Sequence, residues 1–153
     1  MTASAHLSES LEDYLEAIFH IAAAKKAARA KDISDRLGVT RASVTGALRV
    51  LAEKSLVNYS PYDLVTLTSA GAKAARNVVQ RHEALHDFFV TVLGVEESEA
   101  ERSACRMEHA LSPPLLARVA QFVKYVKQKP QLLSVWKRTF KAAGSAAVRA
   151  GAP

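Results

Sequence analysis

The side chains best able to do chemistry in this sequence lie close together on one short stretch. Cys105, Glu108 and His109 are spaced i, i+3 and i+4, and Glu101 precedes them by about one turn. Residues at these spacings share one face of an α-helix, so a thiolate, a carboxylate and an imidazole converge there. Such mixed sulfur, oxygen and nitrogen donors suit a divalent transition-metal ion, whereas a closed structural zinc site more often uses several cysteines.

Two other segments carry potential metal ligands at helical spacing. His82 and His86 are four residues apart, and Asp13 and Glu16 are three apart. A single histidine of this kind is more often packed or solvated, and acidic residues near a helix start more often complement its dipole. Three clusters on three expected helices together favour a metal site. Fe(II), Mn(II), Co(II), Ni(II) and Zn(II) are all chemically suitable for it.

Apolar periodicity, capping residues and chain breakers predict the helices that must position these groups. We expect helices over residues 8–24, 30–37, from Thr40 onward, 68–93, 96–111 and 113–128. Two short β-favouring runs, 56–59 and 64–67, flank a turn-like composition and predict a hairpin. The tail after Pro130 either adds a helix through Trp136 and Phe140, binds DNA phosphates or stays disordered.

The order helix, short helix, glycine-containing turn, helix and hairpin is that of a winged helix-turn-helix. In the third helix Val44, Leu48 and Leu51 form a stripe that can anchor it to the core. The residues that can project into a DNA groove are Thr40, Arg41, Ser43, Thr45 and Arg49. The two arginines rank first, because arginine pairs with guanine edges or phosphates. The alternative is a winged helix used only for protein contacts.

Charge and composition are consistent with a DNA-binding protein that also binds cations. The chain has 153 residues and a net charge of +6, with a basic block at 25–54, an acidic block at 82–109 and a basic tail at 129–153. One cysteine cannot form an internal disulfide. The longest apolar run, 17–24, is too short for a membrane span, and no basic secretory start precedes it. We therefore expect a cytoplasmic protein without a membrane partner.

Five stretches carry a resemblance to a known family: SLEDYLEAIF, LGVTRASVTGALRVLAEKSLV, VTLTSAG, RHEALHDFF and ACRMEHALSP. Over residues 8–128 they resemble the metal-dependent repressors of the diphtheria-toxin-repressor type, including the manganese transport regulators. The resemblance implies a homodimer with a mainly α fold and a small β-hairpin wing. It implies an N-terminal winged helix-turn-helix domain at 1–70, an all-α metal-binding and dimerisation domain at 71–128, and a basic tail at 129–153, without a third domain.

The resemblance also implies ligand sets. The primary metal site corresponds to Asp13, Cys105, Glu108 and His109. A second site is similar to His82, Glu16 and bridging Glu108 in manganese-type members, or to His82, His86 and Glu101 in iron-type members. Asp13 stands where iron-type repressors place methionine, and Cys105 stands where a Bacillus-like manganese regulator places glutamate. The hard ligand favours Mn(II) and the soft one favours Fe(II), with a slight preference for iron, while Zn, Co or Ni can substitute in vitro.

The expected function is a repressor, not an enzyme, in which Fe(II) or Mn(II) is a corepressor for binding a palindromic DNA operator. The regulated genes would concern metal-ion homeostasis. Two alternatives remain open. A winged-helix regulator can sense oxidation through Cys105. A carboxylate-bridged di-metal enzyme would need paired Glu-x-x-His motifs, which this sequence lacks.

Overall fold

The computed structural model describes residues 7–60 and 64–149, with side chains as far as Thr139. The chain forms two compact units, Met1–Val79 and Gln80–Pro153, and the dividing point lies inside helix α4, Ser69–Asp87. Each unit is described by itself below. None of the described helices combines the length and the apolar character that a membrane span requires.

Unit 1 opens with three helices whose ends follow from local sequence. They are α1 (Glu9–Lys25), α2 (Ala30–Leu37) and α3 (Arg41–Glu53). The Ser8 hydroxyl caps α1, and the Thr40 hydroxyl accepts the Ser43 amide at 3.1 Å to cap α3. Gly38 ends α2 at φ +66°, a conformation that β-carbons resist. The bounds of α1 and α2 confirm the predicted ones to within about one residue, and α3 begins one residue after Thr40, as predicted.

The predicted hairpin is present as a small antiparallel wing. Its strands are β1 (Val57–Asn58) and β2 (Thr66–Leu67), with Val57 opposite Leu67. The tip at 61–63 lies outside the described residues. Ala28 and Val65 also exchange two backbone hydrogen bonds, at 3.0 and 2.7 Å, so the loop after α1 is joined to the wing.

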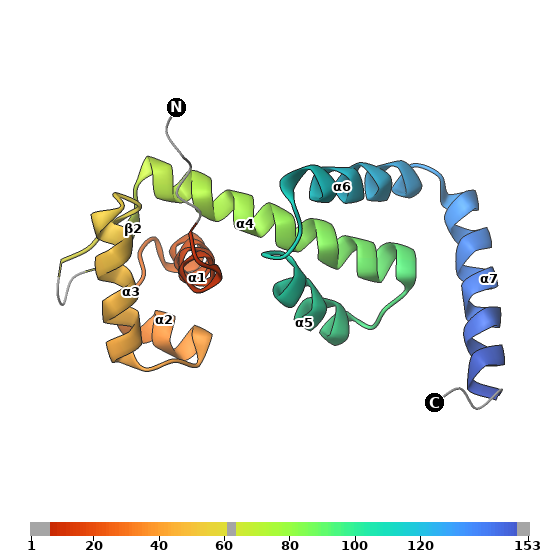
Figure 1. Cartoon of the computed structure of the whole chain (residues 1–153), viewed down its shortest axis with the longest axis horizontal. Coiled ribbons are helices and arrows are strands. Elements are labelled where there is room, and N and C mark those ends of the chain that lie inside the picture. Colours follow the sequence, from red (N-terminus) through yellow and green to blue (C-terminus); the bar gives the residue numbers. More distant parts are fainter. Residues whose placement is uncertain (1–6, 61–63, 150–153) are drawn as a thin grey trace. The chain divides into compact units, whose positions relative to one another are not determined.

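The apolar stripe of α3, made of Val44, Leu48 and Leu51, is buried in the core of unit 1 and holds the helix in place. The largest fully buried side chains of this core come from α1, α2, α3 and the wing: Leu15, Ile18, Ile33, Val44, Leu48, Leu51 and Val65. Figure 1 shows α3 beside β2, with α1 seen end-on next to it. The predicted anchoring stripe is therefore confirmed, and the opposite face of α3 remains exposed.

The first turn of α4 lies against the backbone that leads into the wing. The Thr68 amide donates to the Leu56 carbonyl at 3.0 Å, and the Thr68 hydroxyl accepts the Gly71 amide at 3.0 Å. A β-carbon at Gly71 would overlap the Leu56 carbonyl oxygen. Glycine is thus required at this position because there is no room for a β-carbon.

We expect Gly71→Ala to lower the free energy of unfolding by about 1–3 kcal/mol, because overpacking against backbone outweighs the helix propensity of alanine. Thermal melting followed by circular dichroism measures the change. Gly46→Ala is the matched control, since nothing lies within 4 Å of its would-be β-carbon. That variant should gain up to about 1 kcal/mol. Equal shifts in the two melting curves would contradict the close approach at Gly71.

Unit 2 continues α4 into a π-helical turn, η1, and then three further helices. Their bounds are Phe88–Leu93 for η1, Glu97–Met107 for α5, Pro113–Lys127 for α6 and Pro130–Arg149 for α7. A single α-helix to Leu93 was predicted, and the prediction is wrong for these last six residues. The Trp136 indole donates to the Val92 carbonyl at 2.6 Å, so a partner from α7 satisfies a carbonyl of this turn. Apolar periodicity does not reveal such a distant partner.

Helix α5 is shorter than predicted. It ends at Met107, although the Glu108 amide still donates to the Ala104 carbonyl at 3.0 Å. Ser112 is extended, as a residue before proline prefers to be, so the chain has to leave the helix before it. His109 therefore lies in the turn after α5 and not on a continuing helix face.

A small apolar core holds unit 2 together. Leu85 of α4, Ala104 of α5 and Leu116 of α6 are buried in it, with Phe89 and Leu111 packed against them. The sequence also predicts an apolar packing stripe on α5, made of Ala100, Ala104, Met107 and Leu111. Ala100 is buried as this stripe requires, whereas the Met107 side chain is 40% exposed.

The tail for which three outcomes were open forms a helix over most of its length. Helix α7 contacts η1, and Trp136 supplies the hydrogen bond described above. Figure 1 shows α7 leaving the end of α6 in a new direction. The side chain of Phe140, which was expected to extend the apolar stripe, lies outside the described side chains.

Candidate metal centre and nucleic-acid interface

Glu108 is the centre of the polar cluster in unit 2. Its side chain is 0% exposed, and Oε2 accepts a hydrogen bond from His82 Nδ1 at 2.7 Å. Its other oxygen, Oε1, has no hydrogen-bond donor among the described residues and lies 3.3 Å from His109 Nε2. A buried carboxylate oxygen without a donor is costly unless a cation compensates it. This position therefore fits a metal ligand.

His82 of α4 lies between two carboxylates. Nδ1 faces Glu108, and Nε2 is 3.0 Å from an oxygen of Glu101 on α5. The hydrogen bond to Glu108 is the main cause that raises the pKa of His82 to about 9, with Glu101 adding to it and burial opposing it. At neutral pH the ring is thus an imidazolium that holds the carboxylates together. A proton and a metal ion are alternatives on such a ring.

The pKa of His82 predicts how stability depends on pH when a chelator keeps the protein metal-free. Because the folded pKa of about 9 exceeds the ordinary 6.5, the stabilisation is complete below the lower value and is lost as pH rises through the higher one. Denaturant unfolding between about pH 6 and about pH 10 should show this decrease. Glu108→Gln should reduce the decrease. A wild-type profile that stays flat would contradict the ion pairs.

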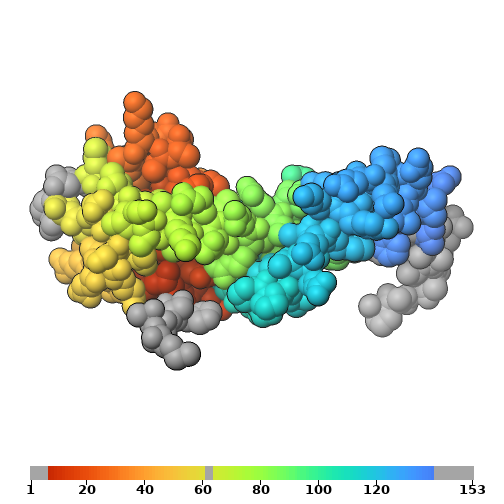
Figure 2. Space-filling model, turned by 90° about the horizontal axis from the view of Figure 1, so that it is seen from above, coloured from red at the N-terminus to blue at the C-terminus, as the bar shows by residue number. Residues whose placement is uncertain are grey.

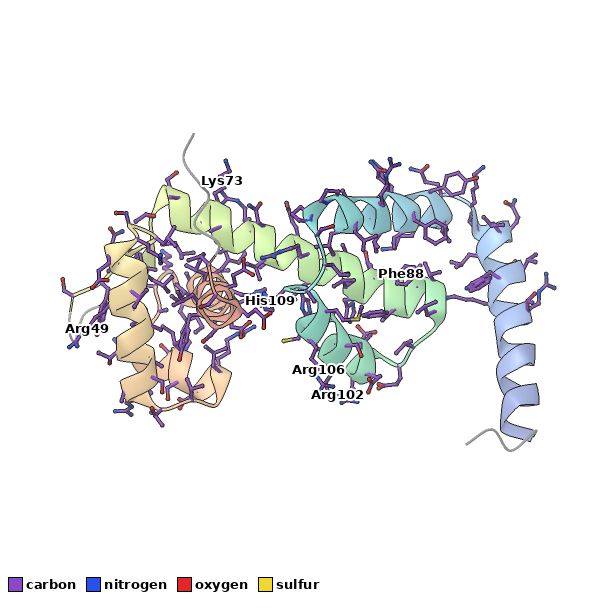
Figure 3. The ribbon with its side chains drawn as sticks, viewed as in Figure 1. Arg49, Lys73, Phe88, Arg102, Arg106 and His109 are labelled. Carbon is purple, nitrogen blue, oxygen red and sulfur yellow. The ribbon has the colours of Figure 1, made fainter. Side chains whose placement is uncertain are left out.

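The remaining predicted ligands of unit 2 lie beside this cluster. His86 Nε2 is 3.3 Å from Glu97 and 3.9 Å from Glu101, and its ring stacks on His82 at 6.3 Å. The structure therefore brings together four predicted residues, His82, His86, Glu101 and Glu108. His109, labelled in Figure 3, lies next to Glu108 in the turn after α5. Glu97 was not predicted, although its i, i+4 spacing from Glu101 indicates the same helix face.

The three remaining predicted ligands lie on α5 of unit 2 and on α1 of unit 1. Cys105 is on α5, one turn before Glu108, and its side chain is exposed. Asp13 and Glu16 are half-buried on α1 in unit 1, where Glu16 pairs with His20 at 3.5 Å. Asp13, Glu16 and His20 are spaced by three and four residues, so they share one face of α1, as this contact requires.

The exposed face of α3 carries two arginines and several hydroxyl groups that already form hydrogen bonds within the protein. The Thr40 and Ser43 hydroxyls bond each other at 2.9 Å, and the Thr45 hydroxyl donates to the Arg41 carbonyl at 3.0 Å. Arg41 and Arg49 are exposed, with no carboxylate partner in the part of the chain that is described. Figure 3 shows Arg49 pointing away from α1. The arginines are thus the groups on this face that can pair with an external anion.

Comparison with known proteins relates both units to one family. Residues 6–65 match the N-terminal DNA binding domain of the iron dependent repressors. Residues 68–137 match the metal binding and dimerisation domain of the same repressors.

Individual relatives agree with this match. The HTH-type transcriptional regulator MntR of Bacillus subtilis is 34% identical over 134 residues, which cover 85% of this chain and 94% of that protein. MntR of Lysinibacillus sphaericus is 34% identical over 124 residues, covering 81% of this chain and 88% of the relative.

Solved structures show the same fold. A manganese-dependent transcriptional repressor in complex with manganese has a TM-score of 0.65 at 33% identity, over 75% of this chain and 53% of that one. IdeR of T. acidophilum has a TM-score of 0.66 at 23% identity, over 78% of this chain and 55% of its own. The chain thus spans about half the length of these structures. The resemblance and the fold class inferred from the sequence are confirmed, and the chain belongs to the iron-dependent repressor family.

Proposed function

We propose that the chain is a cytoplasmic, homodimeric transcriptional repressor that binds a palindromic operator when it holds Fe(II) or Mn(II). Membership of a repressor family indicates a regulator rather than an enzyme. The observation that carries the proposal is the fully buried Glu108 carboxylate, whose Oε1 has no hydrogen-bond donor among the described residues. The genes it regulates would be those of metal-ion homeostasis.

The proposed ligands come from both units. For the primary site they are Asp13, Cys105, Glu108 and His109. For the second site they are Glu16 and His82 with Glu108, or His82 with His86 and Glu101. In support, His82, His86, Glu101, Glu108 and His109 are already neighbours within unit 2. Unit 1, with its winged helix at 1–70, and the helical domain at 71–128 then each contribute ligands.

In this scheme the side chains of the protein have two roles. His82 holds or releases a proton, and the metal ligands limit which arrangement of the two domains binds DNA. Without metal, the imidazolium of His82 neutralises part of the charge on Glu108 and Glu101. A bound divalent ion would supply positive charge in place of this proton, and the residues that would hold it come from both units, among them Asp13 and Glu108. Asp13 and Glu16 lie on α1, which packs against α3. A restriction on the position of α1 therefore also restricts α3, the helix proposed to enter the DNA groove. A palindrome then requires two α3 helices at a fixed separation, about 34–36 Å or a multiple of it.

Apolar side chains that are exposed on unit 2 support the proposal that the protein is a homodimer. They lie on α5, α6 and α7: Met107, Leu115, Phe122, Tyr125, Leu132, Val135 and Trp136. A soluble monomer rarely exposes so many large apolar groups on neighbouring elements. The matched dimerisation domain spans most of them, at residues 68–137.

Fluorescence anisotropy of a DNA duplex tests the proposed function. A duplex selected by the protein from a random pool is titrated anaerobically in chelator, Fe(II), Mn(II) and Zn(II). We expect tight binding with Fe(II) or Mn(II) and weak binding in chelator. A preference for Fe(II) would indicate that Cys105 dominates selectivity, and a preference for Mn(II) would indicate Asp13. Equal binding in chelator and in every metal would overturn the corepressor role.

A further inference from the structure

The sequence after Glu108 contains no acidic side chain. Between residues 109 and 153 there are eight basic ones: Arg118, Lys124, Lys127, Lys129, Lys137, Arg138, Lys141 and Arg149. The first six belong to the described side chains, and all six are exposed on α6, on α7 or between them. Figure 2 shows α6 and the blue first part of α7 at the molecular surface that faces the viewer. The described parts of α6 and α7 therefore expose basic side chains and no acidic ones.

Among the six described cations, four have no acidic partner in the part of the chain that the structure describes. Lys127 pairs with Asp87 at 2.8 Å, and the Lys129 ammonium lies 5.1 Å from the centre of the Tyr125 ring. Within the described side chains, four others have no carboxylate at ion-pair distance: Arg118, Lys124, Lys137 and Arg138. We name these four the cationic surface of α6 and α7.

Among the described acidic groups of unit 2, all except Glu83 are already engaged in hydrogen bonds or ion pairs. Glu99 pairs with Arg102 at 2.6 Å, and Glu96 accepts the Ser98 amide at 3.1 Å at the start of α5. Glu97, Glu101 and Glu108 face the two histidines described above. A neighbouring copy of unit 2 would therefore offer few unengaged carboxylates to the cationic surface. Its counter-charge has to come from a different anion.

The apolar and cationic side chains of α7 lie on different sides of the helix. Leu132, Val135 and Trp136 are spaced i, i+3 and i+4 and share one face. Lys137 and Arg138 follow at about 100 and 200° from Trp136 around the helix, because each residue advances by about 100°. An apolar contact through the first face consequently leaves the two cations available to another partner.

We propose that the cationic surface of α6 and α7 binds the phosphate backbone of double-stranded DNA, independently of base sequence and of metal. The proposal rests on the proposed function, since it adds a second DNA contact to that of α3. DNA carries one charge per about 1.7 Å of its axis, so a set of unpaired arginines and lysines is complementary to it. Contacts of this kind fix position and raise affinity but do not read sequence.

The test uses the full chain, a duplex without operator sequence, a chelator and a series of KCl concentrations. The variant Lys124→Gln/Lys137→Gln/Arg138→Gln removes three unpaired charges. The slope of log K against log salt should become shallower by up to about 2.7 per protomer, because each phosphate that is no longer neutralised lowers it by about 0.9. Circular dichroism checks that the variant is folded.

The matched control, Lys25→Gln/Arg102→Gln/Lys127→Gln, removes the same charge from side chains that have carboxylate partners at 2.8, 2.6 and 2.8 Å. Its slope should change by less than about 1. Equal slopes of log K against log salt for the two triple variants would overturn the inference. It would also be overturned if Lys124→Gln/Lys137→Gln/Arg138→Gln kept the wild-type slope but lost binding to anionic phosphatidylglycerol vesicles. If operator binding by the wild type still requires metal, such results overturn this inference alone. A wild type that ignores metal overturns only the proposed function.

Discussion

Glu108→Gln is expected to bind the operator in Fe(II) or Mn(II) no better than the wild type does in chelator. The substitution keeps the shape of the side chain but replaces the ligand charge at a position that is 0% exposed. A loss of roughly 5- to 150-fold in operator affinity corresponds to the usual size of coupling between two binding sites. The effect is large because the proposal assigns Glu108 to both metal sites.

Anisotropy titrations in metal and in chelator measure the loss, with Glu83→Gln as the matched control. Glu83 is an exposed carboxylate of α4, one residue from His82, and is not a proposed ligand. It should keep the full response to metal. Since Glu108→Gln also weakens the partner of His82, His109→Ala provides a second variant that spares that hydrogen bond. A normal metal response in both ligand variants would contradict the assignment.

Arg49→Ala is expected to weaken operator binding by about 1–3 kcal/mol, or about 5- to 150-fold, while the metal affinity stays unchanged. Arg49 is exposed on the outer face of α3, and the neighbouring hydroxyls of Thr40, Ser43 and Thr45 already bond within the helix. The arginine therefore accounts for much of what this face can offer to a phosphate or a guanine. Anisotropy at saturating Mn(II) gives the DNA affinity, and competition with a fluorescent chelator gives the metal affinity.

Arg106→Ala is the control for this substitution. Arg106 is an exposed arginine of α5, outside both α3 and the cationic surface, and Figure 3 shows it pointing away from α4. Arg106→Ala removes one positive charge, as Arg49→Ala does, and should leave operator binding nearly unaltered. If Arg49→Ala reduced metal affinity as much as DNA affinity, the separation between reading DNA and holding metal would be wrong.

Local signals in the sequence were enough to predict unit 1. Ser8, Gly38 and Thr40 determine helix ends through their own backbone and hydroxyl chemistry, which a single sequence displays. The buried stripe of Val44 and Leu48 follows from helical spacing alone. For this reason the exposed face of α3 could be assigned from the sequence.

Unit 2 was less predictable because its key contacts join residues distant in sequence. The π turn at Phe88–Leu93 includes a carbonyl bonded by Trp136, which is 44 residues further along. His82 and Glu108 are 26 residues apart, so their hydrogen bond cannot be read from spacing. Spacing did identify both as potential ligands. It could not show that Glu108 is fully buried or that Glu97 joins His86.

The most direct test of the central claim is reciprocity between metal and operator. The Mn(II) and Fe(II) affinities of the full chain are measured anaerobically by chelator competition, with and without saturating operator duplex. If the metal is a corepressor, the operator must raise metal affinity by the same factor by which the metal raises operator affinity. We predict equal factors, in the range of about 5- to 150-fold. Metal affinity that is the same with and without operator would contradict the account.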